Sequence, residues 1–259
     1  MGKLARHAAG ALVTALLAIT SLASAEPTEI TVRVISQDAK FIGTSMGGVQ
    51  ITLRDADTGE LLASGLTRGG TGDTARIMRP EAGRSPVLAS DAAAGFSATL
   101  DIQRPRRIEA VAYGPLAQRQ SANRVSATRW VVPGKDVSAG NGWMLEMPGF
   151  NVDVLSPPAH VGISGLPAQV TLRANVTMMC GCPIEPGGLW DADGYEVRAL
   201  LSRGGEPLRE VTLEYAGQTS QFITTLEFDE PGSYEATVYA YDPSNGNTGL
   251  DSVTFSVAR

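Results

Sequence analysis

A two-residue alternation of apolar and polar side chains dominates this sequence after residue 25 and does most to limit its fold. In ITVRV, for example, Ile30, Val32 and Val34 fall on one face of an extended segment. Similar segments follow at short intervals, with Gly, Asp and Pro between them: VQITLRD, LLASGL, FSATLDI and IEAVAY. No long stretch shows helical spacing, and one short helical turn is expected near SDAAA. The sequence therefore predicts an all-β fold.

The first 25 residues have the character of a cleaved secretion signal. Lys3 and Arg6 precede an apolar run, and the small residues ASA stand before Glu26, as signal peptidase requires. We therefore predict that a signal peptide, 1–25, is removed and that the rest of the chain is periplasmic or secreted. No later apolar run has the length of a membrane span, so no membrane span is predicted.

The charge balance argues against a nucleic-acid partner. The chain has 21 Lys and Arg residues against 27 Asp and Glu residues, and its predicted signal holds basic but no acidic side chains. The exported part is therefore more acidic than the net charge of −6 for the whole chain. Apart from RPRR, residues 104–107, it has no basic cluster that could form the cationic face that phosphates require.

Patterns typical of enzymes are absent or out of context. GTSMG, residues 43–47, fits G-x-S-x-G, but a strand-like segment follows it where a nucleophile elbow needs a helix. Beyond the predicted signal, His160 is the one histidine that could act as a base. The sequence has no phosphate-binding loop, dinucleotide fingerprint or HExxH motif. We therefore predict a non-catalytic protein.

The strand pattern divides into two series. Pro157 and Pro158 interrupt pairing within 149–167, and a fresh series begins at AQVTLRANVTM. It continues with YEVRALLS, REVTLEYA, SQFITTLEF, GSYEATVYAYD and DSVTFSVAR, which is the spacing of a β-sandwich. We predict two β-sandwich domains in tandem, 26–151 and 152–259, with the join between Gly149 and Ala168.

Each predicted domain resembles a known type of β-sandwich. Residues 26–151, above all GVQITLRDADTGELLASGLT, resemble transthyretin-like and carboxypeptidase-regulatory-like domains. Residues 152–259 resemble an immunoglobulin-like domain, in which FDEPGSYEATVYAYD would supply the corner tyrosine, Tyr234. Ala236 stands where antibody-type domains have a cysteine, so their inter-sheet disulfide is absent. The resemblance implies a scaffold, commonly non-catalytic, whose function lies in a local site.

That site is predicted in MMCGCP, residues 178–183, which contains both cysteines of the chain and two of its seven methionines. If the preceding strand continues through the motif, Met178, Cys180 and Cys182 share one face and Met179 points to the other. The same face continues the row of Val170, Leu172, Ala174 and Val176, which we expect to point into the core.

The motif has three interpretations. Cysteines and methionines could simply complete a core, since both residue types are commonly buried. A Cys-Gly-Cys disulfide could serve thiol-disulfide exchange, but the backbone must then fold back at Gly181, because the two Cα atoms of an extended C-x-C lie too far apart. Thiolate and thioether ligands could instead bind Cu(I), whereas zinc would need more Cys or His ligands than the motif offers.

We adopt the copper interpretation as the leading prediction: an exported protein that binds or delivers Cu(I) through Cys180, Cys182, Met178 and Met179. Pro183 should end the strand and leave the sulfur atoms at an accessible rim. Met144 and Met147 are further thioethers that could contribute. The expected partner is a periplasmic protein that donates or receives copper.

The alternative prediction is a structural or interaction module without metal. Trp143, Trp190 and Tyr195 could then mark a contact surface, although buried anchors are the commoner role of tryptophan. Two acidic segments, DADTGE and WDADGYE, resemble the start of a calcium loop but lack its later carboxylate. We predict that both are hairpin turns and that neither binds calcium.

Overall fold

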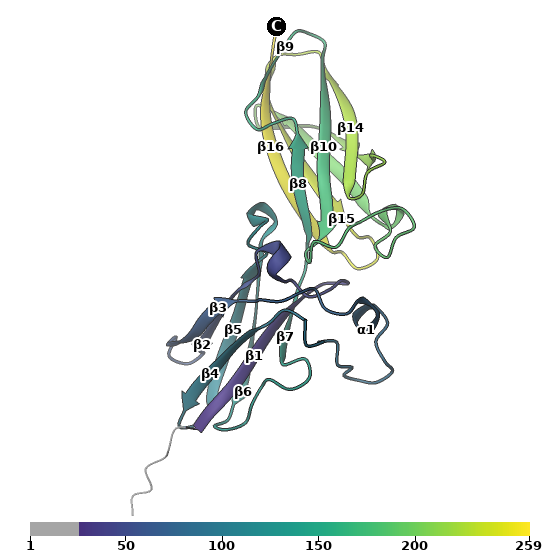
Figure 1. Ribbon diagram of the computed structural model, residues 1–259. Coiled ribbons are helices and arrows are strands. Elements are labelled where there is room, and N and C mark those ends of the chain that lie inside the picture. The colour runs from purple at the N-terminus through teal and green to yellow at the C-terminus, as the bar shows by residue number, and fades with distance from the viewer. Residues whose placement is uncertain (1–25) are drawn as a thin grey trace, which may run out of the picture.

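The computed structural model describes residues 26–259, and the predicted signal peptide lies outside the described residues. The described chain is nearly all β, which confirms the predicted fold class. Its strands form two sandwich-like bodies that lie end to end (Figure 1). We call residues 26–147 the N-terminal sandwich and residues 150–259 the C-terminal sandwich, because the chain changes sheets between them.

The N-terminal sandwich has two sheets, ordered β4-β1-β7 and β3-β2-β5-β6. The strands are β1 (Glu26–Ser36), β2 (Gln50–Asp55), β3 (Leu61–Leu66), β4 (Phe96–Ile102), β5 (Arg106–Gly114), β6 (Asn123–Val131) and β7 (Trp143–Met147). β1 pairs antiparallel with β4 and parallel with β7. The alternation in ITVRV is observed, because Ile30, Val32 and Val34 are all fully buried in the core between the sheets.

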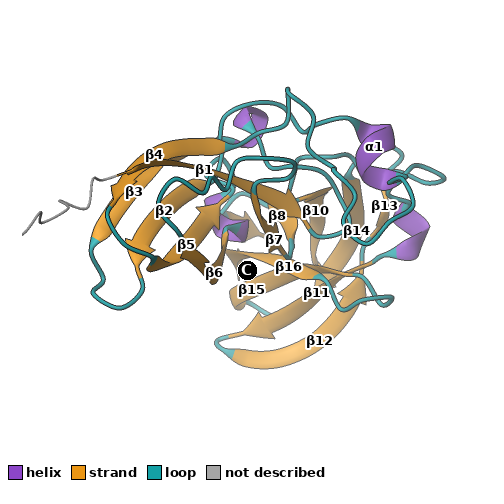
Figure 2. Cartoon of the chain, turned by 90° about the horizontal axis from the view of Figure 1, so that it is seen from below, coloured by secondary structure: helices purple, strands orange, loops and turns teal. Residues whose placement is uncertain are grey.

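The C-terminal sandwich also has two sheets, ordered β13-β14-β10-β8 and β12-β11-β15-β16-β9 (Figure 2). The strands are β8 (Phe150–Ser156), β9 (Gly162–Ser164), β10 (Ala168–Met178), β11 (Glu196–Arg203), β12 (Glu206–Thr212), β13 (Glu214–Tyr215), β14 (Gln221–Phe228), β15 (Gly232–Tyr241) and β16 (Thr248–Ala258). The inward row predicted for β10 is confirmed, since every second residue from Ala168 to Met178 is buried. This row crosses the core and leads directly into the Cys-Gly-Cys motif.

Tyr234 anchors the other end of this core. Its hydroxyl donates a hydrogen bond to the carbonyl oxygen of Glu230, at 2.6 Å. This upstream bond is the geometry of a tyrosine corner. The ring packs against Phe228 and Phe255, with centroid distances of 4.4 and 5.7 Å. The C-terminal core is thus rich in aromatic rings, whereas the N-terminal core is largely aliphatic.

Two expectations about strands and turns were wrong. The second series of strands begins at Phe150 and not at Ala168, because β8 and β9 both lie in the segment that we expected to be a linker. WDADGYE is not a hairpin turn but contains a 3₁₀ turn, η3 (Ala192–Gly194), which connects strands of different sheets. Asp191 caps it by accepting a hydrogen bond from the backbone N–H of Asp193.

The short helical turn also lies elsewhere. Residues 90–94 are not helical, and the helix of this region is α1 (Thr74–Met78). Asp73 caps it, since its side chain accepts a hydrogen bond from the backbone N–H of Arg76 at 2.7 Å. Two further 3₁₀ turns are η1 (Thr44–Met46) and η2 (Arg119–Ser121). Among residues 26–259, no helix has the length and apolar character needed to cross a membrane.

Candidate functional site

The Cys-Gly-Cys motif is a tight turn at the junction of the two sandwiches. β10 ends at Met178, whose carbonyl accepts a hydrogen bond from the N–H of Gly181 at 2.8 Å. The N–H of Met178 in turn donates to the carbonyl of Cys182 at 3.1 Å, and Thr177 forms a bridge with Pro183. Gly181 has a φ of +76°, which is favourable only without a Cβ atom. We expected the strand to continue through the motif. This was wrong, because β10 ends at Met178.

The two cysteines form a disulfide across this turn. Their Cα atoms lie 5.4 Å apart, so the backbone folds back at Gly181 as a C-x-C bridge requires. Both residues are buried, with exposed fractions of 2% for Cys180 and 5% for Cys182. The expectation of accessible sulfur atoms was wrong, because both cysteines are buried, although Gly181 between them is exposed. In this oxidised state both sulfur atoms are used in the bond and neither is a thiolate.

The two methionines of the motif lie in different cores. Met178 belongs to the C-terminal core together with Cys180 and Cys182, so the structure brings these three residues together. Met179 is fully buried in the N-terminal core, and its Sδ lies 3.2 Å from the position that a Cβ on Gly149 would take. Met179 thus points away from the other three, as the alternation predicted, and the structure does not bring the four predicted copper ligands together. Of the two further thioethers, Met147 is buried and Met144 is exposed.

Met46 is a residue of this site that sequence reasoning missed. It ends η1, and its Sδ packs against Gly181 so closely that a Cβ on Gly181 would overlap it. It lies in GTSMG, which we considered only as an enzyme pattern. No spacing or composition links it to MMCGCP, because the contact arises from the docking of the two sandwiches.

The two sandwiches exchange apolar residues at the junction. Met179 of the C-terminal sandwich lies in the N-terminal core. Ala39, which follows β1, is buried in the C-terminal core, and Met78 at the end of α1 packs against the same core. Each body therefore completes the apolar core of the other.

Hydrogen bonds across the junction accompany this exchange. The indole N–H of Trp190 donates to the carbonyl of Asp38 at 2.9 Å. Asn247 accepts a hydrogen bond from the N–H of Gly149 at 2.5 Å and donates to its carbonyl at 3.1 Å. Trp190 and Trp143 are both buried, so neither contributes to an exposed contact surface.

A group of carboxylates lies beside the junction. The ring of Tyr195 is in edge contact with Phe150, at a centroid distance of 5.2 Å. Burial, with added repulsion from Asp242, Asp38 and Asp191, raises the pKa of Tyr195 to about 12. The phenol of Tyr195 is therefore neutral at physiological pH. Among residues 26–259, no three or more His, Cys, Asp or Glu side chains are grouped to hold a metal ion.

Comparisons with known proteins give no family. No protein-family model matches the chain, and no curated protein matches it. Fibronectin(III)-like modules of Clostridium thermocellum CbhA are 16% identical, covering 81% of this chain and 77% of that one, with a TM-score of 0.28. A chimeric titin Z1Z2 is 11% identical, covering 91% of this chain and 98% of that one, with a TM-score of 0.25.

An engineered protein is also similar, at 17% identity and a TM-score of 0.30. The match covers 50% of this chain but only 24% of the engineered one, so it spans about a quarter of that protein's length. TM-scores this low carry no statement about function.

Proposed function

We propose that this chain is an exported, non-catalytic module that holds two β-sandwich domains in one fixed orientation, as a rigid spacer or interaction scaffold. The observation that supports this most directly is Met179, which stands on the disulfide-closed turn of one sandwich and is fully buried in the core of the other. The domains of this proposal are the two sandwiches, 26–147 and 150–259, joined at Pro148 and Gly149, in place of the division between residues 151 and 152 that the sequence suggested.

We expect the two sandwiches to be rigidly held, because separating them would cost a large amount of free energy. Tandem domains move freely unless their interface is large and apolar. Withdrawing one buried methionine side chain costs about 1.5–3 kcal/mol. Exposure of Ala39 and loss of the Trp190 hydrogen bond to Asp38 would add to this cost. The docked arrangement is therefore strongly favoured over one in which the sandwiches swing about Pro148.

Other features support the remaining parts of the proposal. The signal-like leader and the oxidised cysteines agree with an oxidising compartment outside the cytoplasm. The hydrogen bond of Tyr234 supports an immunoglobulin-like type for the C-terminal domain. The hairpin of β2 and β3 supports a transthyretin-like type for the N-terminal domain.

The test is ¹⁵N relaxation of residues 26–259 in solution. We expect the amides of both sandwiches to report one common rotational correlation time, because a rigid pair tumbles as one body. The Met179→Ala variant should give two different correlation times or a shorter common one, and the matched variant Met144→Ala should behave as wild type. Independent tumbling of the two wild-type sandwiches would contradict the proposal.

A second candidate function is Cu(I) binding by the reduced protein. It is favoured by the sulfur content of the junction, where five side chains of Cys and Met meet at one turn: Met46, Met178, Met179, Cys180 and Cys182. Reduction of the disulfide would supply two thiolates, which with a thioether are the ligands that Cu(I) selects. Because Met46 and Met179 lie on the opposite side of the turn, they could join only after the turn rearranges.

This second candidate is tested by competition with a Cu(I) chelator. Reduced protein should take up one Cu(I) with an affinity that rises with pH, while oxidised protein and the Cys180→Ser/Cys182→Ser variant should take up none. Met178→Leu should weaken binding, because Met178 is the thioether that lies in the same core as the two cysteines. Equal copper uptake by the double variant and the reduced wild type would rule this function out. A partner protein that exchanges copper belongs to this candidate alone.

A further inference from the structure

A positively charged hollow lies beside α1, away from the Cys-Gly-Cys turn. Its volume is about 810 Å³, and its wall consists of α1 and the loop that follows it, within residues 75–87. Three arginines line it, Arg76, Arg79 and Arg84, together with Ser85. Glu81 is the one carboxylate of the wall. All of the residues that line the hollow thus come from one continuous segment of the chain.

The loop is held at both ends. Asn141 accepts hydrogen bonds from the N–H groups of Leu88 and Ala89, at 2.7 and 3.0 Å, and donates one to the carbonyl of Pro86 at 2.8 Å. At the other end, Ile77 of α1 is buried in a small core that also contains Phe41. The loop therefore has fixed ends, and the hollow is part of the fold.

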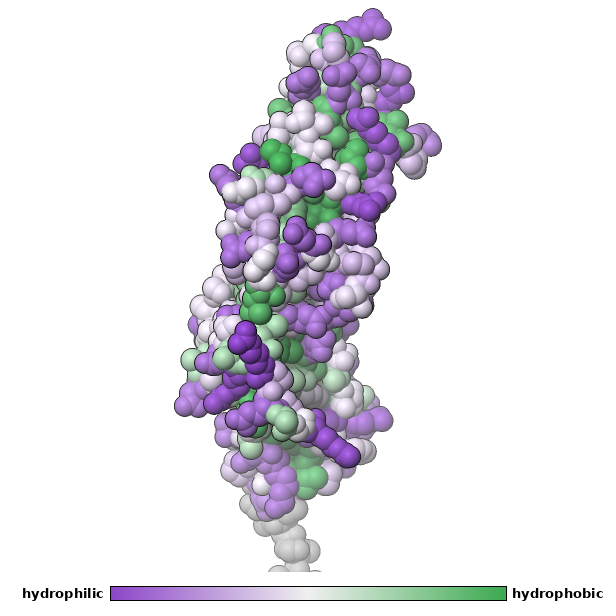
Figure 3. Space-filling view, turned by 90° about the vertical axis from the view of Figure 1, so that its right-hand side faces the viewer, coloured by the Kyte–Doolittle hydropathy of each residue, from purple (hydrophilic) through white to green (hydrophobic). Residues whose placement is uncertain are grey.

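The charges of the hollow contrast with the rest of the molecule. The whole chain carries a net charge of −6, and several of its arginines are neutralised by ion pairs, such as Arg106 with Glu60 and Arg198 with Glu210. Within residues 26–259, the side chains of Arg79 and Arg84 make neither an ion pair nor a hydrogen bond. Figure 3 views the side on which α1 lies, and hydrophilic residues are spread over both halves of this face.

We propose that this hollow binds a ligand that carries a phosphate or sulfate group. A guanidinium presents a planar fork of donors that matches such oxyanions in two parallel hydrogen bonds. Arg76 is already oriented, since its Nη1 donates to the carbonyl of Ala89 at 3.1 Å and leaves its other donors free to turn to the hollow. The volume lies in the range of small-molecule sites, so the group is expected to belong to a larger molecule.

The test is calorimetric titration of residues 26–259 with two probes, inorganic phosphate and a sugar phosphate. The Arg79→Gln/Arg84→Gln variant should lose at least tenfold in affinity for the probe that binds. A matched variant, Arg119→Gln/Arg124→Gln, makes the same change of charge at exposed positions outside the hollow and should lose less than twofold. Glu81→Gln should strengthen binding, because it removes the one negative charge from the wall.

The two probes distinguish the source of the oxyanion. Tighter binding of the sugar phosphate supports the site and assigns it to a larger ligand, and equal binding of both probes supports it as a site for the free anion. The proposal is wrong if wild type binds neither probe, or if both double variants lose affinity equally. Circular dichroism of each variant confirms that it is folded.

Discussion

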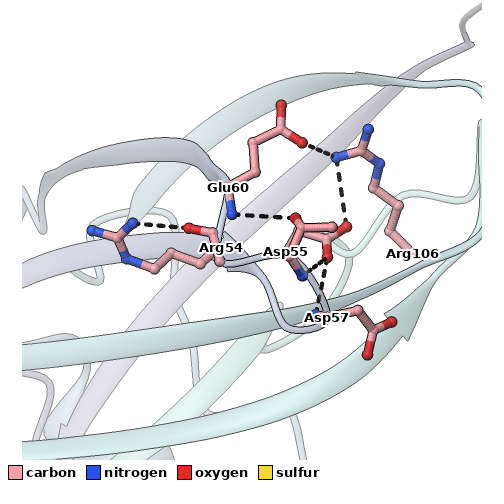
Figure 4. A network of polar contacts seen from close by, with 7 residues as sticks. Arg54, Asp55, Asp57, Glu60 and Arg106 are labelled. Atoms are coloured by element: carbon pink, nitrogen blue, oxygen red, sulfur yellow. Dashed lines mark hydrogen bonds and ion pairs between the residues drawn. The ribbon is translucent and has the colours of Figure 1, made fainter.

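Two turns of this protein contain a glycine with the same backbone φ of +76°, Gly59 and Gly181, yet they are stabilised in opposite ways. The turn between β2 and β3 is closed by polar contacts (Figure 4), since Asp55 Oδ1 accepts hydrogen bonds from the N–H groups of Asp57 and Thr58 at 3.0 and 2.9 Å. Arg106 joins Asp55 and Glu60 across its rim. The turn at Gly181 is closed by a disulfide whose two cysteines are buried, while Gly181 itself is exposed.

The difference lies in what surrounds each glycine. A Cβ on Gly59 would meet no atom within 4 Å, whereas a Cβ on Gly181 would overlap Met46. The first turn is therefore held by polar contacts within the N-terminal sandwich alone, from its own residues and from Arg106 of β5. The second turn depends on contacts with the N-terminal sandwich, which supplies Met46 against Gly181 and the core around Met179. We call this turn the joint, because it connects the two sandwiches. The predictions below test this contrast, beginning with the largest effect.

The largest effect is expected from Met179, which projects from the second turn. Met179→Ala should lower the free energy of unfolding by about 2–5 kcal/mol, because a fully buried side chain is removed and a cavity remains. The control is Met144→Ala, at a side chain that is 38% exposed, which should change it by less than about 0.5 kcal/mol. Urea denaturation measures both. Equal effects would mean that Met179 does not join the two bodies.

The two glycines give a matched pair. Gly59→Ala should cost about 1–2 kcal/mol, the penalty of a Cβ at positive φ. Gly181→Ala should cost about 1–3 kcal/mol more, because its Cβ also overlaps Met46. Adding Met46→Ala to Gly181→Ala should relieve part of this excess, whereas adding it to Gly59→Ala should not. If the two glycine variants are equally stable, the close contact of Met46 with Gly181 does not affect the free energy of unfolding.

The sequence was sufficient wherever stability is local. The core rows of β1 and β10 follow from alternation, and the hairpin at Asp55 follows from its own Asp and Gly residues. In each case the determining residues are neighbours in the chain, so their pattern predicts the structure.

The sequence was insufficient wherever a distant segment completes the structure. Met46 and Ala39 reach the junction only because the sandwiches dock, and nothing in their local pattern indicates it. Pro157 and Pro158 were interpreted as a domain boundary, but they follow β8, which already pairs with β10. Trp190, in a loop, is buried, whereas Trp130, in β6, is 64% exposed. Burial of a single aromatic side chain is decided by its tertiary partners.

Removal of the disulfide should have a smaller effect than removal of Met179. The bond joins residues only two positions apart, so it restricts the unfolded chain little, and the Cys180→Ala/Cys182→Ala variant should lose about 1–2 kcal/mol of stability. Denaturation of wild type in the presence of a reductant should give the same loss, and the double variant should not respond to the reductant. A loss larger than that of Met179→Ala would mean that the covalent bond, and not the apolar contact, dominates the joint.

The smallest effect is expected at the exposed turn and depends on pH. Hydrogen bonds from the backbone of Thr58, and then of Asp57, lower the pKa of Asp55 below its usual value of 3.8, with a further contribution from Arg106. A carboxyl group with a lowered pKa in the folded state stabilises the protein above pH 4 or so, and this contribution is lost as the pH falls through the folded pKa. Asp55→Asn keeps an acceptor oxygen but cannot ionise. We therefore expect the difference in stability between wild type and Asp55→Asn to shrink from pH 7 to pH 3.

Burial and the nearby Asp251 raise the pKa of Asp153, which contributes with the opposite sign in both proteins and so cancels in this difference. The same comparison for Gly181→Ala should be independent of pH, because residues 178–183 have no titrating side chain once the cysteines form a disulfide. If the Asp55→Asn difference is constant with pH, the carboxylate does not stabilise the exposed turn.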